Sequence, residues 1–203
     1  MKPELPPWTG LILAGGYSRR MGTDKALLSW HGQPQVVHLT DLLRAQGAAE
    51  VLVSCRPDQV APFQALGLRP LPDLVPNLGP LGGLLSCFRA HPERACLSVA
   101  VDLPLLGAAA LQALLEARQA GRPAMAFARP DGQGVDPLAA LWEPIMGPLL
   151  EDAWQCGDLA PRRVLQRAGV FLLEPAEPDW LRNANTAEEA LAIQQRIRAL
   201  TGE

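Results

Sequence analysis

Short apolar runs alternate with longer amphipathic segments along this 203-residue chain, and this alternation limits the folds open to it. Runs of strand length lie at residues 8–14, 51–54, 68–71, 95–101, 124–128, 138–142 and 170–173. Segments with helical spacing of apolar residues lie at 34–46, 58–66, 81–90, 108–120, 143–150, 162–168 and 186–200. Strands that alternate with helices form βαβ units, so the sequence predicts an α/β fold, three-layered and doubly wound, with a mostly parallel sheet.

Three polar or glycine positions fall at the ends of predicted strands. Gly15 follows the first strand, Ser54 ends the second, and Asp102 follows the strand at 95–101. Ligands of open parallel sheets bind beyond the carboxyl ends of the strands. We therefore expect these three segments to converge on one ligand site.

Composition narrows the class of protein. Hydrophobic residues make up 48% and charged residues 19%, which is typical of a globular chain, and we expect a single domain over 1–203. The net charge of −3 argues against a nucleic-acid partner, which would need a basic surface. Since no apolar run reaches the about 20 residues of a membrane span, and residues 1–4 lack a signal-peptide core, we expect a cytoplasmic protein with no membrane partner.

The loop at residues 13–25, LAGGYSRRMGTDK, combines glycines with positive charge. It matches neither the dinucleotide fingerprint nor the P-loop. Gly15 and Gly16 have no Cβ, so their N–H groups can approach phosphate oxygens closely. Arg19, a second arginine and Lys25 could neutralise the charge of that phosphate. The alternative is a plain glycine turn with solvated arginines, but the position straight after a buried strand favours phosphate binding.

Asp102 is the candidate metal ligand. It follows a buried strand and is flanked by apolar residues that would aim its carboxylate. Mg²⁺ binds one or two protein carboxylates together with phosphate oxygens and water, so Mg²⁺ is the expected cofactor. The alternative is an N-cap of the helix at 108–120, but Asp102 lies too early for that.

Several motifs resemble one known family over essentially the whole chain. Residues 13–28 resemble the signature loop of the sugar-nucleotide-transferase-like enzymes, and most closely that of the molybdenum cofactor guanylyltransferases. Further matching segments follow in the same order: Gly32-Gln33-Pro34, residues 77–86 (NLGPLGGLLS), Val101-Asp102-Leu103-Pro104, Asp136-Pro137 before a later strand, and Asn183-Ala184-Asn185-Thr186.

The resemblance implies a Rossmann-like nucleotidyltransferase fold of the nucleotide-diphospho-sugar transferase type, and an activity. Such an enzyme transfers GMP from GTP to the molybdopterin cofactor, with Mg²⁺, and releases pyrophosphate. The N-terminal part would bind GTP and Mg²⁺, and the C-terminal part molybdopterin. Arg19, Lys25 and Asp102 would be catalytic, and Asp102 the metal ligand. GTP would be bound by Leu13, Ala14, Gly15, Gly16, Lys25, Ser54, Asp73, Gly82 and Asp102.

The choice of base depends on three places in the chain. A carboxylate such as Asp73 can accept both the N1–H and N2–H donors of guanine, although Asp73 could also be a plain loop residue. The glycines of residues 79–83, Gly82 among them, leave room for a purine ring. After the second strand the guanylyltransferase pattern has Asn, whereas this chain has Ser54, whose side chain is shorter and carries one hydroxyl.

Asn183 and Asn185 are expected on the acceptor side, or bracing the metal loop. Capping of the helix at 186–200 is the alternative, and it explains Asn185 better than Asn183. Both interpretations stay open at this point.

Other activities remain as alternatives: a molybdopterin cytidylyltransferase, a sugar-1-phosphate nucleotidyltransferase, or a non-catalytic nucleotide-binding homologue. The cytidylyl relatives usually have Ala-Ala-Gly where this chain has Ala14-Gly15-Gly16, which favours the guanylyl side. Partners beyond GTP and the molybdopterin cofactor would be an accessory GTP-binding protein and molybdoenzyme chaperones. We expect a monomer or a weak oligomer.

Overall fold

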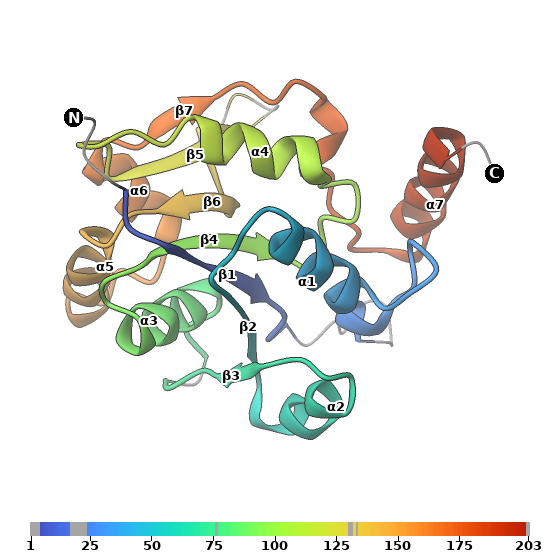
Figure 1. The fold of residues 1–203 in the computed structure, drawn as a ribbon, viewed down its shortest axis with the longest axis horizontal. Coiled ribbons are helices and arrows are strands. Elements are labelled where there is room, and N and C mark those ends of the chain that lie inside the picture. Colours follow the sequence, from blue (N-terminus) through green and yellow to red (C-terminus); the bar gives the residue numbers. More distant parts are fainter. Residues whose placement is uncertain (1–4, 17–23, 76, 130–131, 133, 202–203) are drawn as a thin grey trace.

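The computed structural model describes residues 5–16, 24–75, 77–129, 132 and 134–201. Within this part of the chain, the strands form one seven-stranded sheet in the order β3-β2-β1-β4-β6-β5-β7 (Figure 1). The strands are β1 (Trp8–Leu13), β2 (Glu50–Cys55), β3 (Pro70–Pro72), β4 (Ala95–Ala100), β5 (Ala124–Ala128), β6 (Val135–Trp142) and β7 (Phe171–Leu173). Only β6 runs antiparallel to its neighbours; β1, β2, β3 and β4 pair in parallel, as do β5 and β7.

Helices cover both faces of the sheet. The helices are α1 (Gln35–Ala45), α2 (Val60–Ala65), α3 (Pro80–Ala90), α4 (Ala108–Glu116), α5 (Met146–Gln155), α6 (Pro161–Ala168) and α7 (Ala187–Thr201). In Figure 1, α1 and α4 lie in front of the sheet and α5 and α6 behind it, and α3 packs against α5. These layers confirm the predicted three-layer α/β fold with a mostly parallel sheet.

The central strands are the most deeply buried part of the fold. Every residue of β1 and of β4 is buried, as expected for strands covered on both faces. A second, smaller cluster holds α7 against the segment before α1 and consists of Trp30, Ala184, Ile193 and Ile197.

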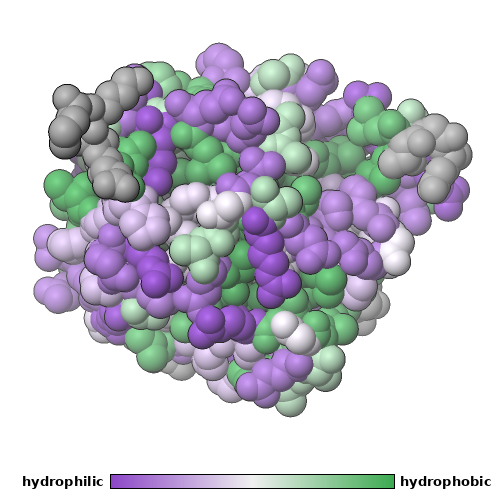
Figure 2. Space-filling view, viewed as in Figure 1, coloured by the Kyte–Doolittle hydropathy of each residue, from purple (hydrophilic) through white to green (hydrophobic). Residues whose placement is uncertain are grey.

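The face in Figure 2 is largely hydrophilic with scattered hydrophobic patches. No helix in the described part of the chain has the length and apolarity needed to cross a membrane.

Several element boundaries differ from those predicted from the sequence. β6 begins at Val135, so Asp136-Pro137 lies inside the strand and not before it. A proline is tolerated there because it lies near the strand's start, where the pairing with β5 shifts register after Ala126. Helix α5 begins at Met146, after Pro144, instead of at residue 143, and it ends at Gln155 instead of at residue 150. Helix α4 ends at Glu116, four residues before its predicted end.

Gly83 in α3 faces β1 and β2 so closely that it has no room for a side chain. A Cβ built there would lie 2.8 Å from Ser54 Cβ and 2.9 Å from Leu13 Cδ2, and closer still to Ser54 Oγ. We expect Gly83→Ala to lower the free energy of unfolding by about 1–3 kcal/mol, because such overpacking exceeds the helix preference of alanine. Urea denaturation would measure this. Gly107→Ala is the control for steric room, because no described atom lies within 4 Å of its Cβ position. Gly107 is the N-cap of α4, so only the smaller loss of a capping preference is expected there, and a loss as large as that of Gly83→Ala would contradict the steric explanation.

Candidate active site

A pocket of about 560 Å³ lies at the carboxyl edge of the sheet, where β1, β2 and β4 end side by side. Leu13, the last residue of β1, pairs with Ser54 of β2 on one side and with Ala100 of β4 on the other. The pocket is lined by Leu13, Ala14, Gly15, Gly16, Lys25, Ser54, Arg56, Pro57, Asp58, Asp73, Asn77, Gly79, Pro80, Ala100, Val101, Asp102 and Leu138. The convergence expected from the strand ends is therefore present.

Most residues assigned to the site by sequence line this pocket, and the others lie elsewhere. Gly82 lies in the wall behind the pocket, where its Cβ position is 3.3 Å from Asp73 Oδ2. Asn183 and Asn185 lie on the segment that precedes α7, outside the lining. Arg19 lies outside the described residues, as does the rest of 17–23.

Lys25 joins three chain segments at the pocket wall. It is the first residue of a short 3-10 helix, Lys25–Leu27, which Asp24 caps by accepting from Ala26 N at 3.0 Å. Lys25 Nζ donates to Asn185 Oδ1 at 2.6 Å and lies 3.9 Å from Asp102 Oδ2. The backbone joins two of these segments, because Ala184 N donates to the carbonyl of Asp102 at 2.9 Å. The structure thus brings the glycine loop, the end of β4 and the Asn183–Asn185 segment together.

Asn185 is held by Lys25 and does not cap α7 with its side chain. Thr186 and Glu189 form the capping box instead. Glu189 N donates to Thr186 Oγ1 at 3.2 Å, and Glu189 Oε2 accepts from Thr186 N at 3.0 Å. The side chain of Asn185 therefore braces Lys25 at the pocket wall.

Asp102 has the electrostatics of a ligand-binding carboxylate. Burial raises its pKa above the ordinary value, the Lys25 ammonium lowers it, and Asp136 raises it further. Asp136 lies at the same edge because β6 starts there and runs antiparallel to β4. Buried charge of this kind is costly unless a cation or further hydrogen bonds compensate it.

The oxygens around Asp102 fit a magnesium ion. Among the described side chains, Asp102 Oδ1 and Asn183 Oδ1 are both buried and have no hydrogen-bond partner. Carboxylate and amide oxygens are ligands of hard divalent cations, and Mg²⁺ needs only one or two carboxylates when phosphate supplies further oxygens. Asp102, with Asn183 beside its loop, is therefore the pair that would hold such an ion.

Asp73 and Ser54 form a polar pair on the opposite wall. Asp73 follows β3 and is tied to β2 through its N–H, which donates to the Cys55 carbonyl at 3.2 Å. Ser54 Oγ donates to Asp73 Oδ1 at 2.7 Å. Burial raises the pKa of Asp73, and the Ser54 hydroxyl opposes this by bonding the charged form. The pair presents a carboxylate to the pocket at the place where the sequence predicted base recognition.

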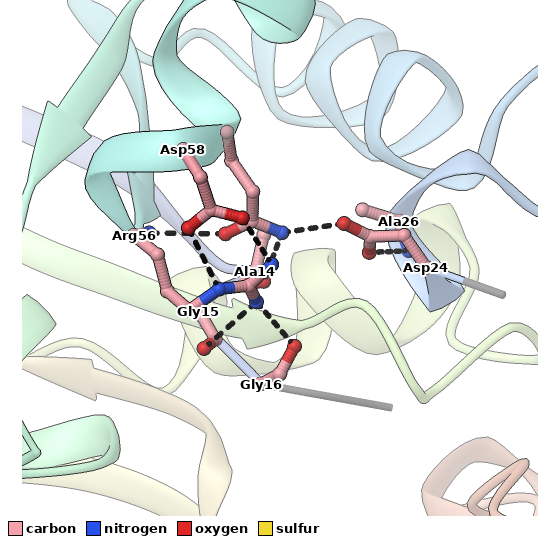
Figure 3. A network of polar contacts seen from close by, with 8 residues as sticks. Ala14, Gly15, Gly16, Asp24, Ala26, Arg56 and Asp58 are labelled. Atoms are coloured by element: carbon pink, nitrogen blue, oxygen red, sulfur yellow. Dashed lines mark hydrogen bonds and ion pairs between the residues drawn. The ribbon is translucent and has the colours of Figure 1, made fainter. Parts of the chain in front are cut away.

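Sequence reasoning missed Arg56 and Gln59, which hold the glycine loop. Arg56 Nη1 donates to the carbonyls of Gly15 and Gly16 (Figure 3), and Gln59 Nε2 donates to the carbonyl of Ala14 at 3.1 Å. The available signal was position, because an arginine follows β2 directly at the edge that collects the other site residues.

A glycine turn and a lysine–aspartate pair at the carboxyl edge of such a sheet are typical of α/β proteins that bind a phosphate-bearing ligand. A family model described as the MobA-like NTP transferase domain matches residues 10–171. The match covers most of the chain, so the chain belongs to this family. The resemblance stated from its motifs and the expected nucleotidyltransferase class are confirmed.

Individual relatives agree with this assignment. The chain is 47% identical over 115 residues to a molybdenum cofactor guanylyltransferase of Xanthomonas euvesicatoria, covering 56% of each chain, so it spans about half the length of that relative. It is 33% identical over 198 residues to a protein of the same name from Pseudomonas putida, covering 93% of this chain and 98% of the other. A nucleotidyl transferase structure from Methanothermobacter shares the fold, with a TM-score of 0.79, 20% identity, and coverage of 96% and 99%.

The raised pKa of Asp73 makes a prediction about stability. Because burial disfavours the charged form in the folded protein, ionised Asp73 destabilises the fold at neutral pH. We expect Asp73→Asn to have a higher urea midpoint than the parent at pH 7. The difference should shrink as the pH falls through the raised pKa of folded Asp73, and it should vanish below the ordinary carboxyl pKa, where Asp73 is protonated in both states. The exposed Asp41→Asn is the control, and a lower midpoint of Asp73→Asn at pH 7 would contradict the argument.

Proposed function

We propose that this chain transfers GMP from GTP to the molybdopterin cofactor and releases pyrophosphate, with Mg²⁺ as cofactor. The observation that carries the proposal is the junction of Lys25, Asp102 and Asn185 beside the glycine turn. The names of the curated relatives support the acceptor and the base. The C-terminal segment with Asn183 and Asn185 would face the acceptor.

Nucleotidyl transfer requires an in-line arrangement of three groups. A phosphate oxygen of the acceptor forms a bond to the α-phosphorus of GTP while the bond from that phosphorus to the bridging oxygen of pyrophosphate breaks. The acceptor phosphate is already ionised at neutral pH, so no side chain has to act as a strong base. Catalysis therefore consists of positioning and of charge neutralisation.

The residues of the pocket would supply both the positioning and the charge neutralisation. The turn at Gly15 and Gly16 would bind the triphosphate through its backbone, and Lys25 would neutralise charge near the α-phosphate. Asp102 and Asn183 would hold Mg²⁺, which when bound neutralises further phosphate charge. Asn185 keeps the Lys25 ammonium in place, because the hydrogen bond of 2.6 Å leaves Lys25 Nζ between Asn185 and Asp102.

Guanine recognition is assigned to Asp73. Its carboxylate can accept the N1–H and N2–H donors together, and the Ser54 hydroxyl orients it. Cytosine has no matching pair of donors, so the same carboxylate would discriminate against CTP.

Base choice can be measured by thermal shift with GTP, CTP, ATP and UTP in the presence of Mg²⁺. We expect GTP to raise the melting temperature most, because at equal concentrations the ligand that binds the folded state most tightly stabilises it most. A larger shift with CTP would reject the guanine assignment and favour the cytidylyl alternative.

The metal role of Asp102 can be measured through pyrophosphate release with GTP, Mg²⁺ and the molybdopterin cofactor. We expect Asp102→Ala to slow release by about 100-fold or more, the usual effect of losing one charge-stabilising group. Asp41→Ala, an exposed aspartate on α1, is the control and should match the parent. Equal rates for Asp102→Ala and the parent would remove Asp102 from the mechanism.

A further inference from the structure

We propose that Arg56 is a positioning residue that sets the backbone of the glycine turn for phosphate binding. The inference rests on the proposed function, because it assumes that the turn binds the triphosphate. It adds a residue that lies outside the loop at 13–25 and follows a different strand.

Residues 56–59 hold three consecutive carbonyls of the turn. Gln59 Nε2 donates to the carbonyl of Ala14 at 3.1 Å. Arg56 Nη1 donates to the next two, at 3.3 Å for Gly15 and 2.7 Å for Gly16 (Figure 3). One short segment after β2 therefore determines the direction of every peptide carbonyl from Ala14 to Gly16.

Arg56 is itself fixed on its other side. Its Nε and Nη2 donate to the two carboxylate oxygens of Asp58, each at 3.0 Å. Its backbone N–H donates to Gln59 Oε1 at 3.0 Å, and Gln59 also reaches Asp24 Oδ2 at 2.6 Å. The side chain of Arg56 is 17% exposed and that of Asp58 is 69% exposed, so the more buried partner of the ion pair is the one that touches the turn. Such a bidentate fork holds the guanidinium plane in one orientation.

The direction of the carbonyls decides which groups of the turn can meet an anion. In a trans peptide the carbonyl oxygen and the N–H of the next residue point to opposite sides. Since the carbonyls of Ala14 and Gly15 point to residues 56–59, the N–H groups of Gly15 and Gly16 point away from them. The partial negative charges of these carbonyls are thereby bound to hydrogen-bond donors and do not repel a phosphate.

Gly15 and Gly16 need these hydrogen bonds from Arg56 because they are glycines. Residues without a Cβ have no conformational preference strong enough to hold one backbone direction. Gly15 and Gly16 allow a ligand to come close, and Arg56 supplies the order that these glycines lack. The guanidinium also lines the pocket, so its charge attracts the same anion.

The test measures affinity for Mg²⁺–GTP and for Mg²⁺–pyrophosphate by calorimetry, with guanosine as a ligand that has no phosphate. We expect Arg56→Gln to weaken GTP and pyrophosphate about tenfold or more and to leave guanosine unchanged. Arg56→Lys keeps the positive charge but cannot form the bidentate pair with Asp58, so it should recover only part of the lost affinity for GTP and pyrophosphate. Arg89→Gln is the matched control, because Arg89 forms an equivalent bidentate pair with Glu151 on α3 and α5, away from the pocket.

Other results would overturn the inference. Equal weakening of guanosine would indicate general damage to the pocket, and full recovery by Arg56→Lys would mean that charge alone suffices. Amide hydrogen exchange of residues 14–16 without ligand gives a separate readout, which should quicken in Arg56→Gln and not in Arg89→Gln. If the parent binds neither GTP nor pyrophosphate, the proposed function fails, and unchanged exchange in Arg56→Gln would reject the Arg56 inference on its own.

Discussion

The parallel pairing of β1 with β2 and β4 is the contact on which the site depends. Because all three strands point the same way and Leu13 pairs with Ser54 and Ala100 at or next to the strand ends, the segments that follow the strands leave the sheet together. The glycine turn, the Arg56 segment and Asp102 are distant in sequence and adjacent in space for this reason alone. A sheet with both faces covered by helices leaves that edge as the place where polar groups can gather.

The burial of charged and polar groups at the pocket has an electrostatic cost. Burial raises the pKa of both Asp73 and Asp102, and Asp102 and Asn183 each have a buried oxygen without a hydrogen-bond partner among the described residues. Polar atoms of this kind destabilise a folded chain unless a ligand satisfies them. Lys25 offsets part of the cost through Asp102 and Asn185. A cation and a nucleotide bound at these walls would offset more.

Much of the fold and part of the candidate site can be predicted from the sequence. The apolar runs located every strand of the described residues, and the motif at residues 13–25 predicted a phosphate-binding loop. The antiparallel direction of β6 could not be predicted, because the apolar pattern of a buried strand is the same in either direction. Arg56 was missed because its role is to bond backbone carbonyls of another segment, and no side-chain pattern records such a contact.

What the sequence alone determined is local: periodicity set the elements, and glycine, lysine and carboxylate chemistry marked the loop, Lys25 and Asp102 as site residues. The tertiary structure decided which groups meet. In the folded chain Thr186 caps α7, and the side chain of Asn185 accepts a hydrogen bond from Lys25 instead. Ser54 donates a hydrogen bond to Asp73. Pairings of this kind depend on strand register and on helix packing over long sequence separations, which local patterns cannot encode.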